Sequence, residues 1–124
     1  TLVGIVAQRI IRRICPHCRA MARPSLEEHY AYYEEMTEER GAAYKGTGCE
    51  FCGKTGYLGR IGVYECLVMS GEIRRMLLAR SSPGDIRAEA LREGLVTMKR
   101  DGMLKVKKGI TTSYEVMRNV FSID

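Results

Sequence analysis

Two Cys-x-x-Cys pairs, Cys15–Cys18 and Cys49–Cys52, constrain the fold of this chain more than any other feature. Each pair can present two sulfurs on one side of a tight turn, and two such turns together supply four thiolates at tetrahedral corners. The apolar run at the start of the sequence is too short for a signal-peptide core, so we expect no secretory signal, and paired motifs without one are typical of metal binding in a reducing compartment. We therefore predict one structural Zn²⁺ ion held by Cys15, Cys18, Cys49 and Cys52. Four protein ligands leave no open coordination position, so such a site stabilises a fold and does not activate water.

Other interpretations of the cysteines remain open. Thirty residues separate Cys18 from Cys49, against about 15–20 in common four-cysteine sites, and a helical segment between the pairs accounts for the extra length. The alternatives are unrelated thiols, a redox dithiol, which needs one exposed pair of low pKa, or His17 replacing a cysteine as ligand. We expect His17 to face solvent in its turn, and the fifth cysteine, Cys66, to be buried and inert in a strand.

The remaining sequence predicts an α+β fold. Residues 56–68 alternate between apolar and polar side chains and predict a strand. Residues 1–14 fit a helix or a strand equally well. Between the cysteine pairs, a capping box at Ser25–Glu28 opens a helix that we expect to run to about residue 39 and to stop near Gly41.

Side-chain spacing adds detail to these elements. Tyr30, Tyr33 and Met36 are at helical spacing between the cysteine pairs, and we expect this stripe to pack locally over a small satellite core. Glycines 53 and 56 are expected to curl the backbone so that amides point at the sulfurs. From residue 70 to the end the pattern is helical, with a second capping box at Thr112–Glu115.

The charge of the chain is uneven. Its formal net charge is +5, but residues 25–40 contribute −5 and the rest contributes +10. This balance permits acidic partners without identifying one. No apolar run is long enough to span a membrane. The chain begins without Met inside an apolar stretch, so we expect it to be a piece of a longer protein.

We expect no catalytic machinery in this chain. We expect the chain to contain no Gly-x-x-x-x-Gly-Lys-Ser/Thr phosphate loop, no carboxylate run for magnesium, and no Ser/His/Asp or Cys/His constellation. His29, on the acidic segment, is expected to be a surface residue. The chain alone is therefore predicted not to be an enzyme.

Three stretches resemble the ATPases of type II secretion and type IV pilus assembly. The first runs from Gly4 to Cys18 (Gly-Ile-Val-Ala-Gln-Arg-Ile-Ile-Arg-Arg-Ile-Cys-Pro-His-Cys). The second runs from Gly48 to Glu65 and contains Gly-Cys-Glu-Phe-Cys-Gly-Lys-Thr-Gly-Tyr and Gly-Arg-Ile-Gly-Val-Tyr-Glu. The third is Gly-Ile-Thr-Thr at 109–112, followed by Glu115 and Val116. The resemblance covers nearly the whole chain, in the family's order.

This resemblance implies a C-terminal part of a hexameric, RecA-like motor in the cytoplasm, peripheral to the inner membrane. Residues 1–14 and 56–68 would be a strand pair at the edge of the ATPase core, 15–55 a zinc-bearing insertion, and 69–124 a C-terminal helical subdomain. Gln8 and Arg9 match an Ala-Gln-Arg motif of the family and would lie near the nucleotide. The partners would be the rest of the core, neighbouring subunits and an inner-membrane platform protein, while ATP and Mg²⁺ would bind only the parent ATPase.

Two other functions compete with this one. A free zinc ribbon that binds nucleic acid would need exposed aromatic residues among basic ones, but Tyr30, Tyr32 and Tyr33 lie in the acidic segment. A chaperone-type cysteine-rich module would repeat its cysteine–glycine unit, and glycines follow only the second pair. We therefore expect a motor subdomain that binds no nucleic acid.

Overall fold

The computed structural model describes residues 4–38 and 43–120. It is an α+β fold of two small antiparallel sheets and five helices within these ranges, which confirms the predicted fold class. The strands are β1 (Gly4–Ile14), β2 (Arg19–Ala22), β3 (Ala43–Gly46) and β4 (Tyr57–Val68). The helices are α1 (Leu26–Met36), α2 (Gly71–Leu78), α3 (Pro83–Arg92), α4 (Met98–Lys107) and α5 (Ser113–Asn119).

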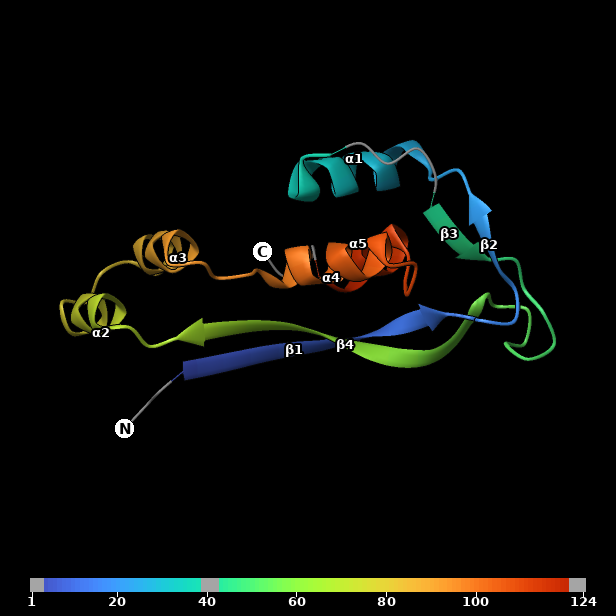
Figure 1. The fold of residues 1–124 in the computed structure, drawn as a ribbon. Coiled ribbons are helices and arrows are strands. Elements are labelled where there is room, and N and C mark those ends of the chain that lie inside the picture. The colour runs from blue at the N-terminus through green and yellow to red at the C-terminus, as the bar shows by residue number, and fades with distance from the viewer. Residues whose placement is uncertain (1–3, 39–42, 121–124) are drawn as a thin grey trace.

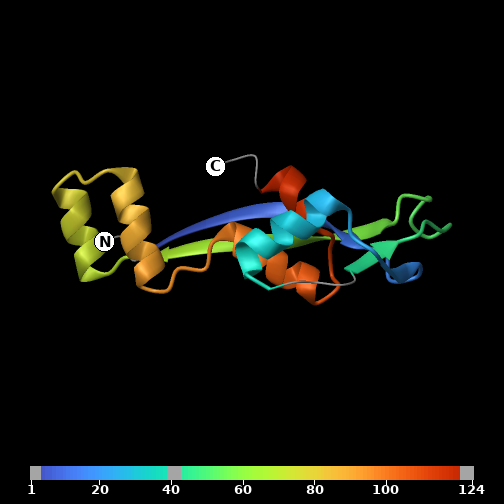
Figure 2. The same cartoon turned by 90° about the horizontal axis from the view of Figure 1, so that it is seen from above.

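The longest element is a ribbon of two strands, β1 and β4. They pair antiparallel from Gly4 opposite Val68 to Ile14 opposite Tyr57, with an irregularity between Arg12 and Ile14. Periodicity left residues 1–14 undecided, and pairing with β4 accounts for the strand. Figures 1 and 2 show α4 and α5 lying along one side of this ribbon.

The two faces of the ribbon differ sharply. Val63 and Ile11 lie on the face toward the helices and are fully buried. Side chains on the opposite face are exposed, and they include Val6, Ile10, Tyr64 and Val68. One face of the ribbon is therefore part of the core, and the described residues leave the other uncovered.

The segment between the cysteine pairs forms a second, short sheet and one helix. Strands β2 and β3 pair antiparallel, and α1 lies above α4 and α5 in Figure 1. The predicted capping box is confirmed, because the Glu28 amide donates to the Ser25 hydroxyl and the Glu28 carboxylate accepts from the Ser25 amide. The helix ends at Met36, ahead of the expected residue 39, where Thr37 adopts a left-handed conformation with φ 56°. Gly41 lies outside the described residues.

The expected packing of Tyr30 and Tyr33 was wrong. Both side chains are exposed, while Tyr32 is 3% exposed and sits in the core together with Ala31 and Met36. The helix face that turns inward is set by contact with α4 and α5, which single-segment periodicity does not reveal. The core joins three parts of the chain, the ribbon, α1 and the C-terminal helices, through Ile11, Ala31, Tyr32, Met36, Val63, Met98, Met103, Val106, Val116 and Val120.

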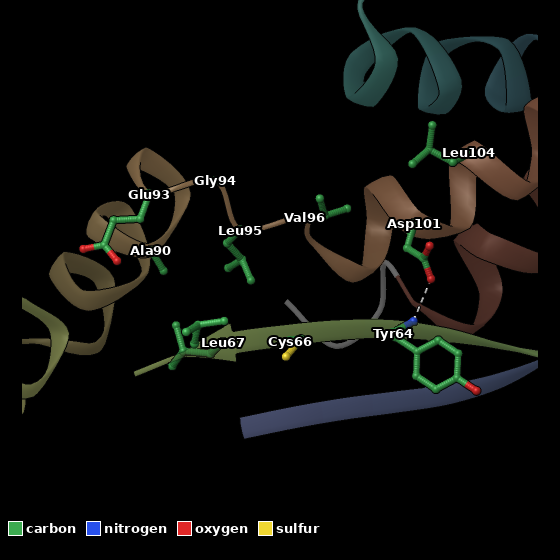
Figure 3. A pocket seen from close by; sticks show the side chains of 11 residues that line it. Tyr64, Cys66, Leu67, Ala90, Glu93, Gly94, Leu95, Val96, Asp101 and Leu104 are labelled. Atoms are coloured by element: carbon green, nitrogen blue, oxygen red, sulfur yellow. Dashed lines mark hydrogen bonds between the residues drawn. The ribbon is translucent and has the colours of Figure 1, made fainter. Parts of the chain in front are cut away.

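Helices α2 and α3 form a hairpin at one end of the ribbon, apart from the other helices (Figure 2). The Arg87 guanidinium pairs with Glu65 of β4 at 3.0 Å and ties the hairpin to the ribbon. A groove of about 710 Å³ separates α3 from α4 over the end of β4, and Figure 3 shows its lining. Among the described residues, no helix combines the length and apolar character needed to cross a bilayer.

The prediction that Cys66 is buried was wrong. Its side chain is exposed, and in the ribbon it lies opposite Val6, which is 66% exposed. Both residues belong to the face that the helices leave open. Alternation correctly placed Cys66 on a strand, but it could not say which face would be covered.

A partly buried ion pair connects β1 to α5. The Arg12 guanidinium donates from Nε and Nη2 to Oε1 of Glu115, at 2.9 and 2.6 Å, and the Arg12 backbone amide donates to Oε2 at 3.0 Å. Thr111 also donates to the Arg12 carbonyl at 2.8 Å. The second predicted capping box is therefore only half formed: Thr112 caps the Glu115 amide, while the Glu115 carboxylate is occupied by Arg12 and not by the cap backbone.

Candidate metal centre

The sulfurs of Cys15, Cys18, Cys49 and Cys52 gather in one cluster, all within 4.8 Å of one another. The Cys15–Cys49, Cys18–Cys52 and Cys49–Cys52 sulfur pairs are separated by 3.7, 3.8 and 3.7 Å. A tetrahedron with centre-to-corner distances of about 2.3 Å, the zinc–thiolate length, has edges of about 3.8 Å. These three sulfur–sulfur distances therefore match the edge length of a tetrahedral zinc–thiolate site.

Each cysteine pair lies in a turn between two strands. Cys15 and Cys18 join β1 to β2, and Cys49 and Cys52 join β3 to β4. Backbone hydrogen bonds hold the two turns together: the Cys15 amide donates to the Gly56 carbonyl at 2.9 Å, and the Thr47 amide donates to the Cys18 carbonyl at 3.1 Å. The site thus stands where the ribbon meets the short sheet.

Two glycines let the turns approach closely. A Cβ added to Gly46 would lie 2.0 Å from the Gly56 carbonyl oxygen, and Gly56 itself has φ +84°. A side chain at position 46 would push apart the backbones that position Cys15 and Cys52. This requirement is a backbone contact between distant segments, so sequence reasoning missed Gly46.

Backbone amides point at two of the sulfurs. The Gly48 amide donates to Cys18 Sγ at 3.3 Å, and the Cys49 and Gly56 amides donate to Cys52 Sγ at 3.3 and 3.2 Å. Such hydrogen bonds offset the negative charge of thiolate ligands. The expectation for Gly56 is confirmed, whereas the Gly53 amide donates to the Glu50 carbonyl instead of a sulfur.

The surroundings of the sulfurs shift the thiol pKa values of Cys15 and Cys52 in opposite directions. Burial raises the pKa of Cys15 to about 11. Burial also acts to raise that of Cys52, but the hydrogen bonds from the Cys49 and Gly56 amides and from the neighbouring thiols outweigh it and lower the pKa to about 6. A metal ion bound here would displace the protons of those cysteines that are still thiols, because thiolates are the metal ligands.

The expectation that the chain contains no phosphate-loop pattern was wrong, because the sequence pattern is present. Residues 48–55 read Gly-Cys-Glu-Phe-Cys-Gly-Lys-Thr and match Gly-x-x-x-x-Gly-Lys-Thr. A phosphate loop opens a helix, whereas this segment leads into strand β4. Its amides are also in use, since Lys54 donates to the Cys49 carbonyl and Gly48 to Cys18 Sγ. Residues 48–55 therefore form the second cysteine turn and not a phosphate-binding loop.

The other predicted residues lie away from the cluster's interior. His17 is exposed, as expected, and its ring stacks on Phe51 with centroids 4.0 Å apart. His29 is partly buried on α1. Gln8 and Arg9 are both exposed on β1, where neighbouring side chains point to opposite faces, and Gln8 donates to the Tyr64 hydroxyl at 3.1 Å. The structure does not bring Gln8 and Arg9 together with the cysteines.

Comparison with known proteins places this arrangement in a family. The model of the family described as type II/IV secretion system protein matches residues 1–118. The chain belongs to this family. The match favours the motor subdomain over the nucleic-acid ribbon and the chaperone-type module.

Individual relatives agree with the family match. The chain is 42% identical over 117 residues, 94% of its length, to the type IV pilus assembly ATPase PilB of Thermus thermophilus. It is 35% identical over 95% of its length to the type II secretion system protein E of Aeromonas hydrophila, and 30% identical over 97% to the type IV pilus assembly ATPase TfpB of Acinetobacter baylyi. The chain spans only 13%, 23% and 21% of these three proteins, respectively.

Proposed function

We propose that the four cysteines hold a structural Zn²⁺ ion. The observation that carries this proposal is the set of three sulfur–sulfur distances of 3.7–3.8 Å. Four thiolates in tetrahedral array are typical of zinc or of iron–sulfur centres. The thiols of Cys15 and Cys52 are buried, and all four protein ligands come from the chain, so the site has no position for a reacting water.

The role of this site is to fasten the insertion to the rest of the fold. Cys15 follows directly from β1 and Cys52 precedes β4, while Cys18 and Cys49 lead into and out of the segment that carries α1. Helix α1 in turn contributes Tyr32 and Met36 to the core. A metal at the turns therefore holds both ends of a segment whose middle packs on α4 and α5.

We further propose that the chain is the C-terminal part of a hexameric cytoplasmic ATPase that powers type II secretion or type IV pilus assembly. Two of the relatives named above are called pilus assembly ATPases, which supports the activity for the parent protein. ATP and Mg²⁺ would bind the parent, which would lie peripheral to the inner membrane and act on a platform protein there.

The open face of the ribbon supports the proposed division into parts. Val6, Ile10 and Val68 are 66%, 50% and 66% exposed on that face, and an exposed apolar sheet face is typical of an interface. We propose that residues 1–14 and 56–68 form the edge of the RecA-like core, with 15–55 as the zinc-binding insertion and 69–124 as the helical subdomain. Gln8 and Arg9, on β1, would then lie near the nucleotide edge of the core.

A phosphate-release assay tests the assignment of roles. The purified 124-residue chain should hydrolyse no ATP above a buffer blank, with or without added Zn²⁺, while the full-length parent protein should turn over ATP. Turnover by the pure chain would contradict the proposal that it is a structural and partner-contact part. Inactivity of a folded, hexameric parent would contradict the motor assignment.

A further inference from the structure

Helix α1 carries a second apolar stripe on the side that faces solvent. Leu26, Tyr30 and Tyr33 are spaced at i, i+4 and i+7, which places them on one line along the helix. Their exposed fractions are 69%, 59% and 47%. The opposite side of the same helix is the one that buries Ala31 and Tyr32. Core packing therefore explains only one of the two apolar faces of α1.

Two exposed glutamates border this stripe. Glu27 and Glu34 are seven residues apart, so they lie on the same flank of the stripe, and both are exposed. Neither makes an ion pair within residues 4–38 and 43–120. By contrast, Glu35 and Glu38 are engaged with the body of the protein, through Thr97 and through Lys107. The described part of α1 contains no lysine or arginine.

The stripe is held in a fixed geometry. The Ser25 capping box defines the start of the helix, and Arg100 donates to the Glu35 carbonyl at 3.0 Å near its end. A surface that is already ordered loses little conformational entropy when a partner binds. Exposed tyrosines on a rigid helix are the kind of side chain that dominates protein interfaces.

We propose that the outer face of α1, formed by Leu26, Tyr30 and Tyr33 with Glu27 and Glu34, docks a basic amphipathic segment of another protein. The charge decides the class of occupant: phosphates of nucleic acids and of anionic lipids are repelled by this flank, whereas a segment with lysine or arginine beside apolar residues complements both features. The proposal goes beyond the metal site and the motor function and depends on neither.

Site-specific photocrosslinking tests the proposal. The photoreactive amino acid p-benzoylphenylalanine is placed at position 30 of the full-length protein in its own cells, and the cross-linked segment is mapped by mass spectrometry. The matched control carries it at Tyr114, which is 52% exposed on α5 and outside the acidic flank. We expect position 30 to yield a segment of another protein in which lysine or arginine accompanies regularly spaced apolar residues.

Variants then test the chemistry of docking. A synthetic peptide of the mapped segment is titrated against the purified chain by fluorescence anisotropy. Tyr30→Ala with Tyr33→Ala should weaken binding about tenfold or more, and Glu27→Lys with Glu34→Lys at least about fivefold, with a lower association rate. Since all four side chains are exposed, circular dichroism should show an unchanged fold. A cross-link no stronger than at position 114, a cross-link only to another copy of this chain, an acidic mapped segment, or binding indifferent to both double variants would each overturn the proposal.

Discussion

The contact between Arg12 and Glu115 offers the sharpest test of how the C-terminal helices are attached to the ribbon. The Glu115 side chain is 2% exposed, and its two oxygens accept from the Arg12 guanidinium and the Arg12 amide. In Glu115→Gln only one oxygen remains. Either the Arg12 guanidinium or the Arg12 backbone amide must therefore face the NH₂ group of the glutamine, which is itself a donor and cannot accept a hydrogen bond.

The expected loss of stability in Glu115→Gln depends on how exposed the Arg12 and Glu115 side chains are. Breaking a fully buried ion pair costs about 3–5 kcal/mol, but the Arg12 side chain is 39% exposed and can recover some hydration. We therefore expect Glu115→Gln to lower the free energy of unfolding by about 2–3 kcal/mol, a fall in melting midpoint of about 6–12 °C for a chain of this size. Thermal unfolding of the metal-loaded chain, followed by circular dichroism, measures it. Glu72→Gln, which loses an exposed pair with Arg75, is the matched control and should leave the midpoint unchanged.

The same pair predicts a pH dependence. Burial acts to raise the pKa of Glu115, but its hydrogen bonds and charge attraction with Arg12 outweigh burial and hold the pKa below its ordinary value of 4.5. A lowered folded-state pKa stabilises the fold above the unfolded value and loses that contribution as pH falls through the folded value. The stability gap between the wild type and Glu115→Gln should thus be constant above pH 4.5 and shrink below it. Equal midpoints of the two proteins at pH 7 would show that the contact between Arg12 and Glu115 does not stabilise the fold.

Other variants test the metal centre and its surroundings. Cys49→Ser should lower zinc affinity by more than about 100-fold, beyond the usual range for outer-shell changes, while Cys66→Ser on the open face should keep full metal content by elemental analysis. Equal metal loss in both would contradict the ligand assignment. Gly46→Ala should destabilise the chain by about 3 kcal/mol or more in denaturant unfolding, since its Cβ would meet the Gly56 backbone. Gly71→Ala, whose Cβ would meet nothing within 4 Å, should not destabilise it.

Local chemistry made much of this fold predictable from sequence. The four cysteines gathered as their spacing indicated, and the capping box at Ser25 opened α1 as expected. The helical pattern expected from residue 70 onward appears as helices α2, α3, α4 and α5. Each Cys-x-x-Cys pair and each capping box lies within a few neighbouring positions, so these patterns can be recognised directly in the sequence.

What escaped prediction depends on contacts between distant segments. Which face of α1 turned inward, and which face of the ribbon left Cys66 open, were decided by α4 and α5. The pairing of Arg12 with Glu115 joins residues 103 positions apart, and the capping pattern at Thr112 pointed to a different role for that carboxylate. The phosphate-loop pattern at 48–55 is a local sequence pattern that did not predict the structure, because strand β4 follows it and not a helix.

The proposed metal site requires four sulfurs of one chain around a single zinc ion. X-ray absorption spectroscopy at the zinc edge, on the purified chain with its native metal, tests this most directly. We predict one zinc per chain and a first shell of four sulfur scatterers at about 2.3 Å, without nitrogen or oxygen. A folded chain free of metal, or a shell in which nitrogen or oxygen replaces sulfur, would contradict the account.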